Sequence, residues 1–359
     1  MYDSALALLA CPLCRGDLAL TAETRDPDDG EILEARLSCV SCGKSFPVTN
    51  GIPRFITEDS GYNPTWNYKW TKIDRGRGLN YKILDRSDPA FETHNVFDCN
   101  GYEGRAHECA RGRSVLDIGC GVGQYSVEIL RRYDPAHVTA VDLTEGVDIF
   151  RKILRERYPE YKQKILMVQA SVFALPFRPG SFDYVFSFGV LHHTGRTRDA
   201  IRAAADMASE GGHLNFWIYA SSIVPISVRE PGRTRPLREL IFAMYYMWIE
   251  FTWIRLFRNM SPAAAARIIR PFASDFWTWF NRIPFLKYLG MIVFPTIQHP
   301  DREYRFLNLF DGYCNHWDDT WSEHEIFPTL RECGIAIKGI SPWRLGFWGV
   351  KQSGFYDTE

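Results

Sequence analysis

The sequence predicts an α/β protein whose centre is a parallel β-sheet with helices on both faces. The first observation is the stretch 115–126, where an apolar run ends in three glycines and helix-like periodicity follows. The second is a series of further short apolar runs that alternate with helix-like segments, as is typical of parallel sheets covered by helices. The third is a pair of Cys-x-x-Cys motifs near the N-terminus, which predicts a small separate unit.

The glycine turn after the first strand has the features of a nucleotide site. Gly119, Gly121 and Gly123 follow Asp117, and they allow positive φ and a close approach of a ligand to the backbone. The spacing differs from the Gly-x-Gly-x-x-Gly of dinucleotide folds, and no Gly-Lys-Ser/Thr ending of a phosphate-binding loop follows. Asp142 ends the next apolar run, where a carboxylate can accept hydrogen bonds from a ribose diol. The sequence therefore predicts a site for an adenosine without phosphates.

These motifs resemble those of class I S-adenosylmethionine (SAM) dependent methyltransferases, over roughly residues 113–220. The glycine turn resembles their motif I, Asp142 their ribose-binding acid, and residues 169–177 and 182–194 their third and fourth motifs. The nearest resemblance is to small-molecule methyltransferases of the quinone-biosynthesis type (methyltransferase type 11). It implies a Rossmann-like seven-stranded sheet with SAM as cofactor. The cofactor-binding residues that it implies are Asp117, Gly119, Cys120, Gly121, Gly123, Tyr125, Asp142, Leu143, Ser171, Val172, Phe188 and Gly189.

One residue departs from the family pattern. Ser171 stands where these enzymes usually carry an aspartate that meets the adenine amino group. A hydroxyl can hydrogen-bond but has no charge. Adenine recognition is therefore expected to rest partly on backbone groups.

The sheet elements can be assigned in order. Strands are expected at Ser114–Ile118, Val138–Val141, Ile165–Val168, Tyr184–Phe188 and His213–Tyr219, with a helix over Asp199–Ala208 and a turn at Gly211-Gly212. A helix over Trp321–Cys333 and strands at Ile335–Ile340 and Gly346–Gln352 are expected to close the sheet. The predicted divisions of the chain are 1–58 (ribbon), 59–112 (helical cover), 113–220 (core), 221–305 (insertion) and 306–359 (end of the core sheet).

The N-terminal unit is predicted to be a small β ribbon that holds a metal. Cys11, Cys14, Cys39 and Cys42 supply four thiolates, the number that a closed structural zinc site takes. Strand-like runs, 18–21 and 32–37, flank an acidic, turn-rich tip. With its ending at 46–55, the segment resembles the zinc-ribbon domain of the tRNA methyltransferase activator family. Free buried thiols are the alternative.

Charge and composition limit the kinds of molecule that the protein is expected to bind and the compartment in which it is expected to work. Residues 1–59 hold five Lys/Arg against ten Asp/Glu, so this ribbon would repel RNA phosphates, and a structural or docking role is favoured. The whole chain has a formal net charge of −1, which gives no general attraction to nucleic acid. Nine cysteines, four of them in pairs, suit a reducing compartment. Residues 1–10 lack a basic start and do not read as a signal peptide, so a cytoplasmic protein is expected.

About 85 residues separate the fifth strand from the closing helix, and they are rich in aromatic residues. Residues 220–300 carry ten Lys/Arg and four Asp/Glu. The segment 240–257 is apolar but contains Glu250 and Arg255, which argue against a membrane-spanning helix. This insertion is expected to be a substrate-covering lid or a peripheral membrane contact through residues 240–297. A packed helical subdomain or a homodimer interface is the alternative.

The chemistry predicted for such a site is methyl transfer to a small-molecule or lipid-linked acceptor, by O- or C-methylation. His192 and His193 follow the fourth strand and are candidates for a general base, and His316 is another. Tyr68, Tyr81 and His94 are candidates for the pocket. No Asn-Pro-Pro-Tyr motif follows the fourth strand, which argues against DNA as substrate. The alternative functions are an RNA methyltransferase and a SAM-binding scaffold without turnover.

Overall fold

The computed structural model describes residues 1–56, 64–75, 109–220, 244, 247–283, 285–294, 299–315, 319–341 and 346–352. The chain divides into two compact units. The first contains residues 1–62, 83–220 and 319–359, and the second contains residues 63–82 and 221–318. Tyr81, His94 and His316 lie outside the described residues.

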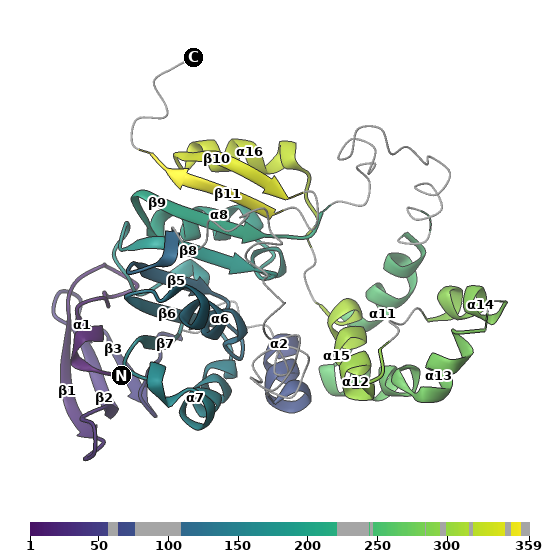
Figure 1. Cartoon of the computed structure of the whole chain (residues 1–359), viewed down its shortest axis with the longest axis horizontal. Coiled ribbons are helices and arrows are strands. Elements are labelled where there is room, and N and C mark those ends of the chain that lie inside the picture. The colour runs from purple at the N-terminus through teal and green to yellow at the C-terminus, as the bar shows by residue number, and fades with distance from the viewer. Residues whose placement is uncertain are drawn as a thin grey trace. The chain divides into compact units, whose positions relative to one another are not determined.

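The first unit is built on a seven-stranded mixed sheet (Figure 1). Its strands are β5 (Ser114–Ile118), β6 (His137–Asp142), β7 (Ile165–Gln169), β8 (Phe182–Phe188), β9 (Ala208–Trp217), β10 (Ile335–Ser341) and β11 (Gly346–Lys351). They lie in the order β10-β11-β9-β8-β5-β6-β7. Strands β5 to β9 run parallel to one another, and β11 pairs antiparallel with both β9 and β10. All five predicted core strands are therefore present.

The sequence predicts a turn at Gly211-Gly212, before the fifth strand. In the structure this glycine pair lies inside β9. Phe182 pairs with Ala208 and Tyr184 pairs with His213, so four residues of β9 stand opposite the single Asp183. Gly211 has a φ of +73°, which glycine accepts without strain. The predicted turn is thus an irregularity within a longer strand.

Helices pack on both faces of the sheet because successive residues of a strand point to opposite sides. Their bounds are α6 (Gln124–Tyr133), α7 (Gly146–Arg157), α8 (Thr197–Met207) and α16 (Glu323–Glu332). Val115 and Tyr184 share a buried cluster with α6, whereas Leu116 and Val185 share another with α8 and α16. Short 3-10 turns follow α7, β7 and β8. They are η3 (Pro159–Tyr161), η4 (Val172–Ala174) and η5 (Leu191–His193).

The N-terminal ribbon is a four-stranded antiparallel sheet. It contains α1 (Asp3–Leu6), β1 (Leu18–Arg25), β2 (Ile32–Cys39), β3 (Ser45–Thr49) and β4 (Ile52–Pro53). Its core residues, including Leu37 and Phe55, belong to the same buried cluster as α8 and the large sheet. The ribbon and the large sheet therefore share one core within the first unit.

The ribbon joins the large sheet along its β7 edge (Figure 1). Arg54 forms a parallel bridge with Gln169, and the Phe55 amide donates to the Gln169 carbonyl at 2.7 Å. A second backbone contact joins the start of the ribbon to the segment after η4, where Leu9 forms an antiparallel bridge with Phe177. The contacts at Gln169 pair the carboxyl end of β7, which would otherwise present unpaired backbone groups at the sheet edge.

A buried carboxylate anchors the tip of the ribbon to α7. Glu31 contacts Arg151 at 2.6 Å and Arg155, and it accepts from the Met1 amine at 2.9 Å. Burial alone would raise the pKa of Glu31, but the hydrogen bonds from Arg151 and from that amine outweigh it and lower the pKa to about 2. The ionised form of Glu31 is therefore the one that holds the ribbon in place.

The second unit is helical. Its elements are α2 (Pro64–Tyr68), η1 (Lys69–Asp74), η6 (Glu250–Ile254), α11 (Arg255–Arg258), α12 (Pro262–Ile269), η7 (Arg270–Ala273), α13 (Asp275–Phe280), α14 (Leu286–Val293) and α15 (Arg302–Tyr313). Phe257, Phe294 and Phe310 form the centre of its own buried cluster. Tyr68, a pocket candidate, packs against this cluster, with its ring 5.9 Å from that of Phe310.

The second unit combines two parts of the chain. One is residues 221–318, in which Phe306, Phe310 and Tyr313 of α15 pack into the aromatic cluster. The other is residues 63–82. Lys69 pairs with Asp311 at 2.9 Å and links these two parts of the chain. Among the residues that the structure describes, no helix is long and apolar enough to cross a membrane.

Candidate functional site

The glycine turn occupies the carboxyl edge of β5 and leads into α6. Gly119, Gly121 and Gly123 all have positive φ, at +82°, +54° and +87°. A Cβ on Gly119 would lie 2.4 Å from the Val190 side chain, and one on Gly123 would lie 2.1 Å from the Phe150 ring. Both the backbone conformation and the packing therefore require glycine at these positions.

Asp142 holds the glycine turn from the end of the neighbouring strand. One of its carboxylate oxygens accepts from the Gly121 amide at 2.7 Å. The other accepts from the Thr144 amide at 2.8 Å and from the Thr144 hydroxyl at 2.6 Å. A carboxylate offers about four acceptor positions, so most of them are already used by the protein. The ribose-binding residue predicted from the sequence is thus also the residue that shapes the turn.

Asp117 is a second buried carboxylate at this edge. Its side chain accepts from the Ser126 hydroxyl of α6 at 2.6 Å. Burial raises the pKa of Asp117 to about 7, with a further contribution from the charge of Asp142, while the Ser126 hydrogen bond opposes the shift. Burial also raises the pKa of Asp142. Two buried carboxylates beside a turn of backbone amides make this edge suited to a ligand that carries hydroxyl groups and positive charge.

The remaining predicted cofactor residues lie at the ends of the adjacent strands. Leu143 follows Asp142, and its carbonyl accepts from the Gln169 side chain at 3.2 Å. Buried Ser171 caps η4 by accepting from the Phe173 amide at 3.3 Å, and Val172 is half-buried beside it. Cys120 is buried within the turn, and burial raises the pKa of its thiol. These positions follow β5, β6 and β7 directly, and the carboxyl ends of these three parallel strands share one edge of the sheet.

The end of β8 contributes aromatic and glycine residues. Phe188 is buried, and its ring meets that of Tyr125 edge-on with a centroid separation of 5.4 Å. Gly189 has a φ of +74°, and a Cβ there would lie 2.6 Å from the Trp217 ring. The backbone after β8 therefore passes directly against Trp217, which only glycine permits.

The two histidines that follow β8 are both buried in η5. The His192 ring lies 3.9 Å from that of His193 and 4.0 Å from that of Tyr219, measured between centroids. Neither ring nitrogen of His192 has a hydrogen-bond partner among the described residues. Burial, together with the neighbouring His193, lowers the pKa of His192 well below its usual value. His192 is therefore a neutral imidazole at neutral pH.

The ribbon contacts this edge through a short chain of side chains. Arg54 contacts Asp148 at 2.7 Å and the Gln169 side-chain oxygen at 2.7 Å. The same Gln169 amide then donates to the Leu143 carbonyl. The sequence analysis did not single out Arg54 or Gln169 as site residues, because their partners are 115 and 26 residues away in the chain. Thr144 could have been found, since Asp-x-Thr at a strand end is typical of a local side-chain turn.

The four cysteines of the ribbon form one cluster. Their sulfur atoms all lie within 4.8 Å of one another, with Cys11–Cys42 at 3.7 Å and Cys14–Cys39 at 3.5 Å. Four thiolates that bind one zinc ion at about 2.3 Å are separated by about 3.8 Å, so these distances fit a tetrahedral site.

The two knuckles that present the cysteines have the same geometry. The Arg15 amide donates to the Cys11 carbonyl and the Gly43 amide donates to the Cys39 carbonyl, at 2.8 and 3.0 Å. Arg15 and Gly43 both have positive φ, at +62° and +71°. The repeated turn gives each knuckle two thiolates on one side of the chain, which is the arrangement that a four-sulfur metal site needs.

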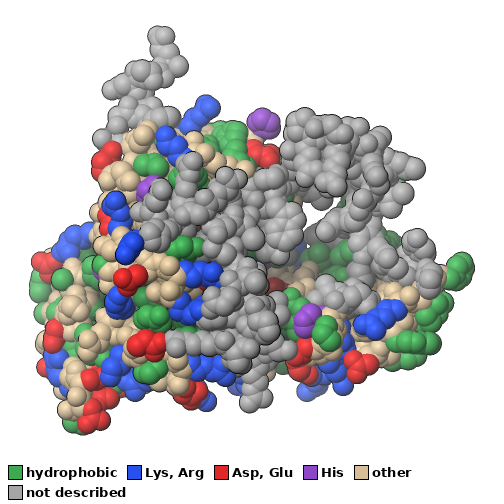
Figure 2. Space-filling view, viewed as in Figure 1, with side chains coloured by type: hydrophobic (Ala, Val, Ile, Leu, Met, Phe, Trp, Pro, Cys, Tyr) green, Lys and Arg blue, Asp and Glu red, His purple; other side chains and the backbone are tan. Residues whose placement is uncertain are grey.

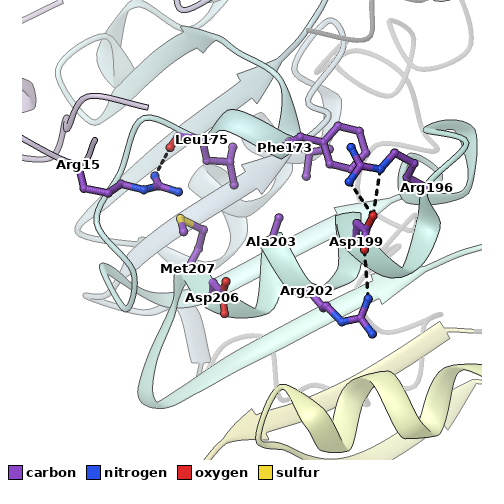
Figure 3. Close-up of a pocket in the computed structure, with 10 residues that line it drawn as sticks. Arg15, Phe173, Leu175, Arg196, Asp199, Arg202, Ala203, Asp206 and Met207 are labelled. Carbon is purple, nitrogen blue, oxygen red and sulfur yellow. Dashed lines mark hydrogen bonds and ion pairs between the residues drawn. The ribbon is translucent and has the colours of Figure 1, made fainter. Parts of the chain in front are cut away.

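A cavity of about 340 Å³ lies between the ribbon, η4 and α8 (Figure 3). Of the predicted cofactor residues, only Val172 lines it. Its arginines are engaged: Arg15 donates to the Phe177 carbonyl at 2.7 Å, and Arg196 and Arg202 both contact Asp199. The cavity has a mixed polar and apolar lining, and it is not the place where the glycine turn and Asp142 meet.

Comparison with known proteins identifies the two domains. Residues 116–216 match the methyltransferase domain family, and residues 5–51 match the Trm112p-like protein family. The chain thus contains a methyltransferase domain preceded by a Trm112p-like domain with a four-cysteine cluster. The first family implies SAM as methyl donor, and the cysteine cluster indicates a metal site.

The curated relatives match about a third of this chain. Erythromycin 3''-O-methyltransferase of Saccharopolyspora erythraea is 31% identical over 35% of this chain and 40% of its own length. A ubiquinone/menaquinone biosynthesis C-methyltransferase of Paracoccus denitrificans is 33% identical over 32% of this chain and 46% of its own length. The chain therefore spans less than half of the length of these relatives. A SAM-dependent methyltransferase structure from Aquifex aeolicus covers 76% of this chain and 97% of its own, with 13% identity and a TM-score of 0.38.

Proposed function

We propose that this protein is an enzyme that transfers a methyl group from SAM to a small-molecule acceptor, by O- or C-methylation. The observation that carries the proposal is the glycine turn held by Asp142 at the carboxyl edge of the parallel strands. The match of residues 116–216 to the methyltransferase domain family supports it. The names of the two relatives, one an O- and the other a C-methyltransferase, support a small-molecule acceptor, and a lipid-linked one is the narrower form of the same proposal.

The proposed cofactor roles follow from the positions of the side chains. SAM supplies an activated methyl group on a sulfonium, so the protein needs to orient the reactants and exclude water. Asp142 would accept a hydrogen bond from the ribose diol at its remaining acceptor position, with Thr144 fixing its orientation. Asp117 would face the positively charged end of the cofactor. Ser171 would receive the adenine edge, together with backbone groups of η4.

Proton removal from the acceptor is the second task of the site. We propose that His192 or His193 takes this proton, because both lie at the end of β8 beside Tyr219. His192 is unprotonated at neutral pH, so its ring can accept a proton. Its burial among aromatic rings disfavours the cation that would form, which makes it a weak base unless the acceptor's developing charge offsets that cost. His316 remains a candidate that lies outside the described residues.

We propose that the Trm112p-like domain binds one structural zinc ion and supports the cofactor edge. The four sulfur positions would be filled by Cys11, Cys14, Cys39 and Cys42, which leaves none for a reacting water. The contacts of Arg54 with Gln169, and of Gln169 with Leu143, support the second part. They link the ribbon to the residue next to Asp142 by two hydrogen bonds.

The test is whether the purified protein converts SAM to S-adenosylhomocysteine when small-molecule acceptors or a cell extract fraction is supplied. Conversion that Asp142→Ala reduces at limiting SAM would support the proposal. SAM binding without any conversion would favour the scaffold alternative. Conversion that needs RNA, weakened by added salt, would favour the RNA alternative, against which the acidic ribbon argues.

A further inference from the structure

The helices α13 and α14 of the second unit form a hairpin with apolar side chains on two sides. On the inner side, Trp277 packs against Phe272 with ring centroids 5.1 Å apart, and its indole N–H donates to the Phe294 carbonyl at 3.1 Å. Buried Asn281 of the first helix end lies against Gly290 of the second. This inner side fixes the hairpin to the aromatic cluster of the unit.

The outer side of the hairpin is also apolar, but it is exposed. The exposed fractions are 66% for Phe276, 57% for Trp279, 86% for Phe285, 50% for Leu289 and 39% for Val293. Residues spaced three or four apart lie on the same side of a helix, so Phe276 and Trp279 share a side of α13 and Leu289 and Val293 share a side of α14. Phe285 stands between the two helices. Figure 2 shows hydrophobic side chains, in green, at the end of the second unit that α13 and α14 form.

An apolar surface of this size needs a covering. Each exposed aromatic side chain offers on the order of 100–200 Å² of surface, so Phe276, Trp279 and Phe285 alone present several hundred Å², to which Leu289 and Val293 add. Soluble proteins rarely leave a continuous apolar patch of that size uncovered. A helix that is apolar around most of its circumference is normally surrounded by an apolar medium.

The charges around the hairpin indicate what that medium is. Residues 247–294 contain six Lys/Arg and two Asp/Glu. Arg255, Arg267 and Arg282 are exposed. Asp275 of α13 contacts Arg305 at 2.5 Å, and its own side chain stays 86% exposed. Aromatic side chains together with excess arginine are typical of segments that lie at the surface of an anionic membrane. A two-fold interface between copies would instead bring the same basic patch against itself.

We propose that the α13–α14 hairpin is a peripheral docking site for an anionic lipid bilayer. Phe285, Phe276 and Trp279 would enter the boundary between headgroups and acyl chains, and the exposed arginines would contact lipid phosphates. The contact is parallel to the membrane surface and does not span it. It concerns the second unit alone and does not depend on the methyl transfer proposed above.

The test is sedimentation of the full-length protein with vesicles, compared between phosphatidylcholine alone and phosphatidylcholine mixed with phosphatidylglycerol. Phe276→Ser combined with Phe285→Ser removes apolar surface from the outer side, where loss of packing is small. Val40→Ser is the matched control, because Val40 is 66% exposed on the ribbon, as exposed as Phe276. Circular dichroism and light scattering establish that each variant is folded and report its oligomeric state.

We expect the wild type and Val40→Ser to bind the anionic vesicles, with binding that weakens as salt is raised. The double variant should bind at least about tenfold more weakly. The proposal is overturned if the wild type binds neither vesicle type, or if the folded double variant binds as the wild type does. A double variant that changes from dimer to monomer, while the wild type ignores vesicles, would assign the surface to a second copy of the chain.

Discussion

Replacing Asp142 tests the core of the proposed site. Asp142→Ala removes the acceptor for three hydrogen bonds, from the Gly121 amide at 2.7 Å and from the Thr144 amide and hydroxyl at 2.8 and 2.6 Å. Hydrogen bonds to a charged group are each worth about 1.5–3 kcal/mol. Most of that loss would lower the stability of the unliganded turn, because the donors belong to the protein.

The effect on SAM binding combines two contributions. The ribose loses its carboxylate acceptor, and the cofactor must also order a glycine turn that the Gly121 hydrogen bond no longer holds. We expect the binding free energy to fall by about 1–3 kcal/mol, which is roughly a 5- to 150-fold increase in Kd. Asp142→Asn should also weaken binding, because its NH2 group would face either the Gly121 amide or the Thr144 donors.

Isothermal titration calorimetry with SAM and S-adenosylhomocysteine measures this effect. Asp134→Ala is the matched control, because Asp134 lies before the opposite end of β6, with a side chain 75% exposed and paired with Lys164. It should bind as the wild type does. An Asp142→Ala protein that is folded and binds both ligands with unchanged affinity would refute the assignment of this edge as the cofactor site.

Three further predictions concern the ribbon and the buried carboxylates. Glu31→Gln should lower the free energy of unfolding by about 3–5 kcal/mol, because buried Arg151 loses its counter-charge. The pKa of Glu31 is about 2 in the folded protein and 4.5 for a free side chain, so the stability that Glu31 contributes should disappear as the pH falls from 4.5 to about 2. Thermal unfolding measures both effects. For Asp117 the pH dependence of stability is reversed, because its pKa is raised from 3.8 to about 7. The unliganded protein should lose up to about 4 kcal/mol of stability as the pH rises through this range. Asp117→Asn should remove this dependence of stability on pH. Cys11→Ser should release zinc and lower the melting temperature of the first unit, whereas Cys333→Ser should retain the metal; equal zinc content in both would contradict the four-thiolate site.

Local sequence patterns were sufficient for the strands and for the glycine turn. The apolar run 114–118 was predicted with the bounds that β5 has, because it is limited by a charged segment before it and by glycines after it. Gly119 and Gly123 were recognised from spacing alone, since the steric requirement for glycine is local to the turn. The two Cys-x-x-Cys pairs indicated a metal cluster for the same reason, because each pair is formed by a single short turn.

The interactions between distant segments were decided by the tertiary structure. The sequence does not show that Gln169 contacts both Arg54 and Leu143, because this requires the ribbon to lie along β7. It also does not show that Glu31 lies against Arg151, which is 120 residues away. Nor does it show that the core residues of the ribbon and those of the large sheet exclude water together.

The sequence by itself determined the class of fold, the positions of the turn residues and the residue types offered to a cofactor and a metal. These depend on backbone conformation and side-chain period, which act over a few residues. The tertiary structure decided which charges are buried and which aromatic residues of the second unit remain exposed. It also decided that neither ring nitrogen of buried His192 has a hydrogen-bond partner among the described residues. Burial depends on segments that are distant in sequence and meet only in the folded chain. The pKa values of Asp117 and Glu31, and the apolar face of α13 and α14, therefore follow from the tertiary structure and not from local sequence.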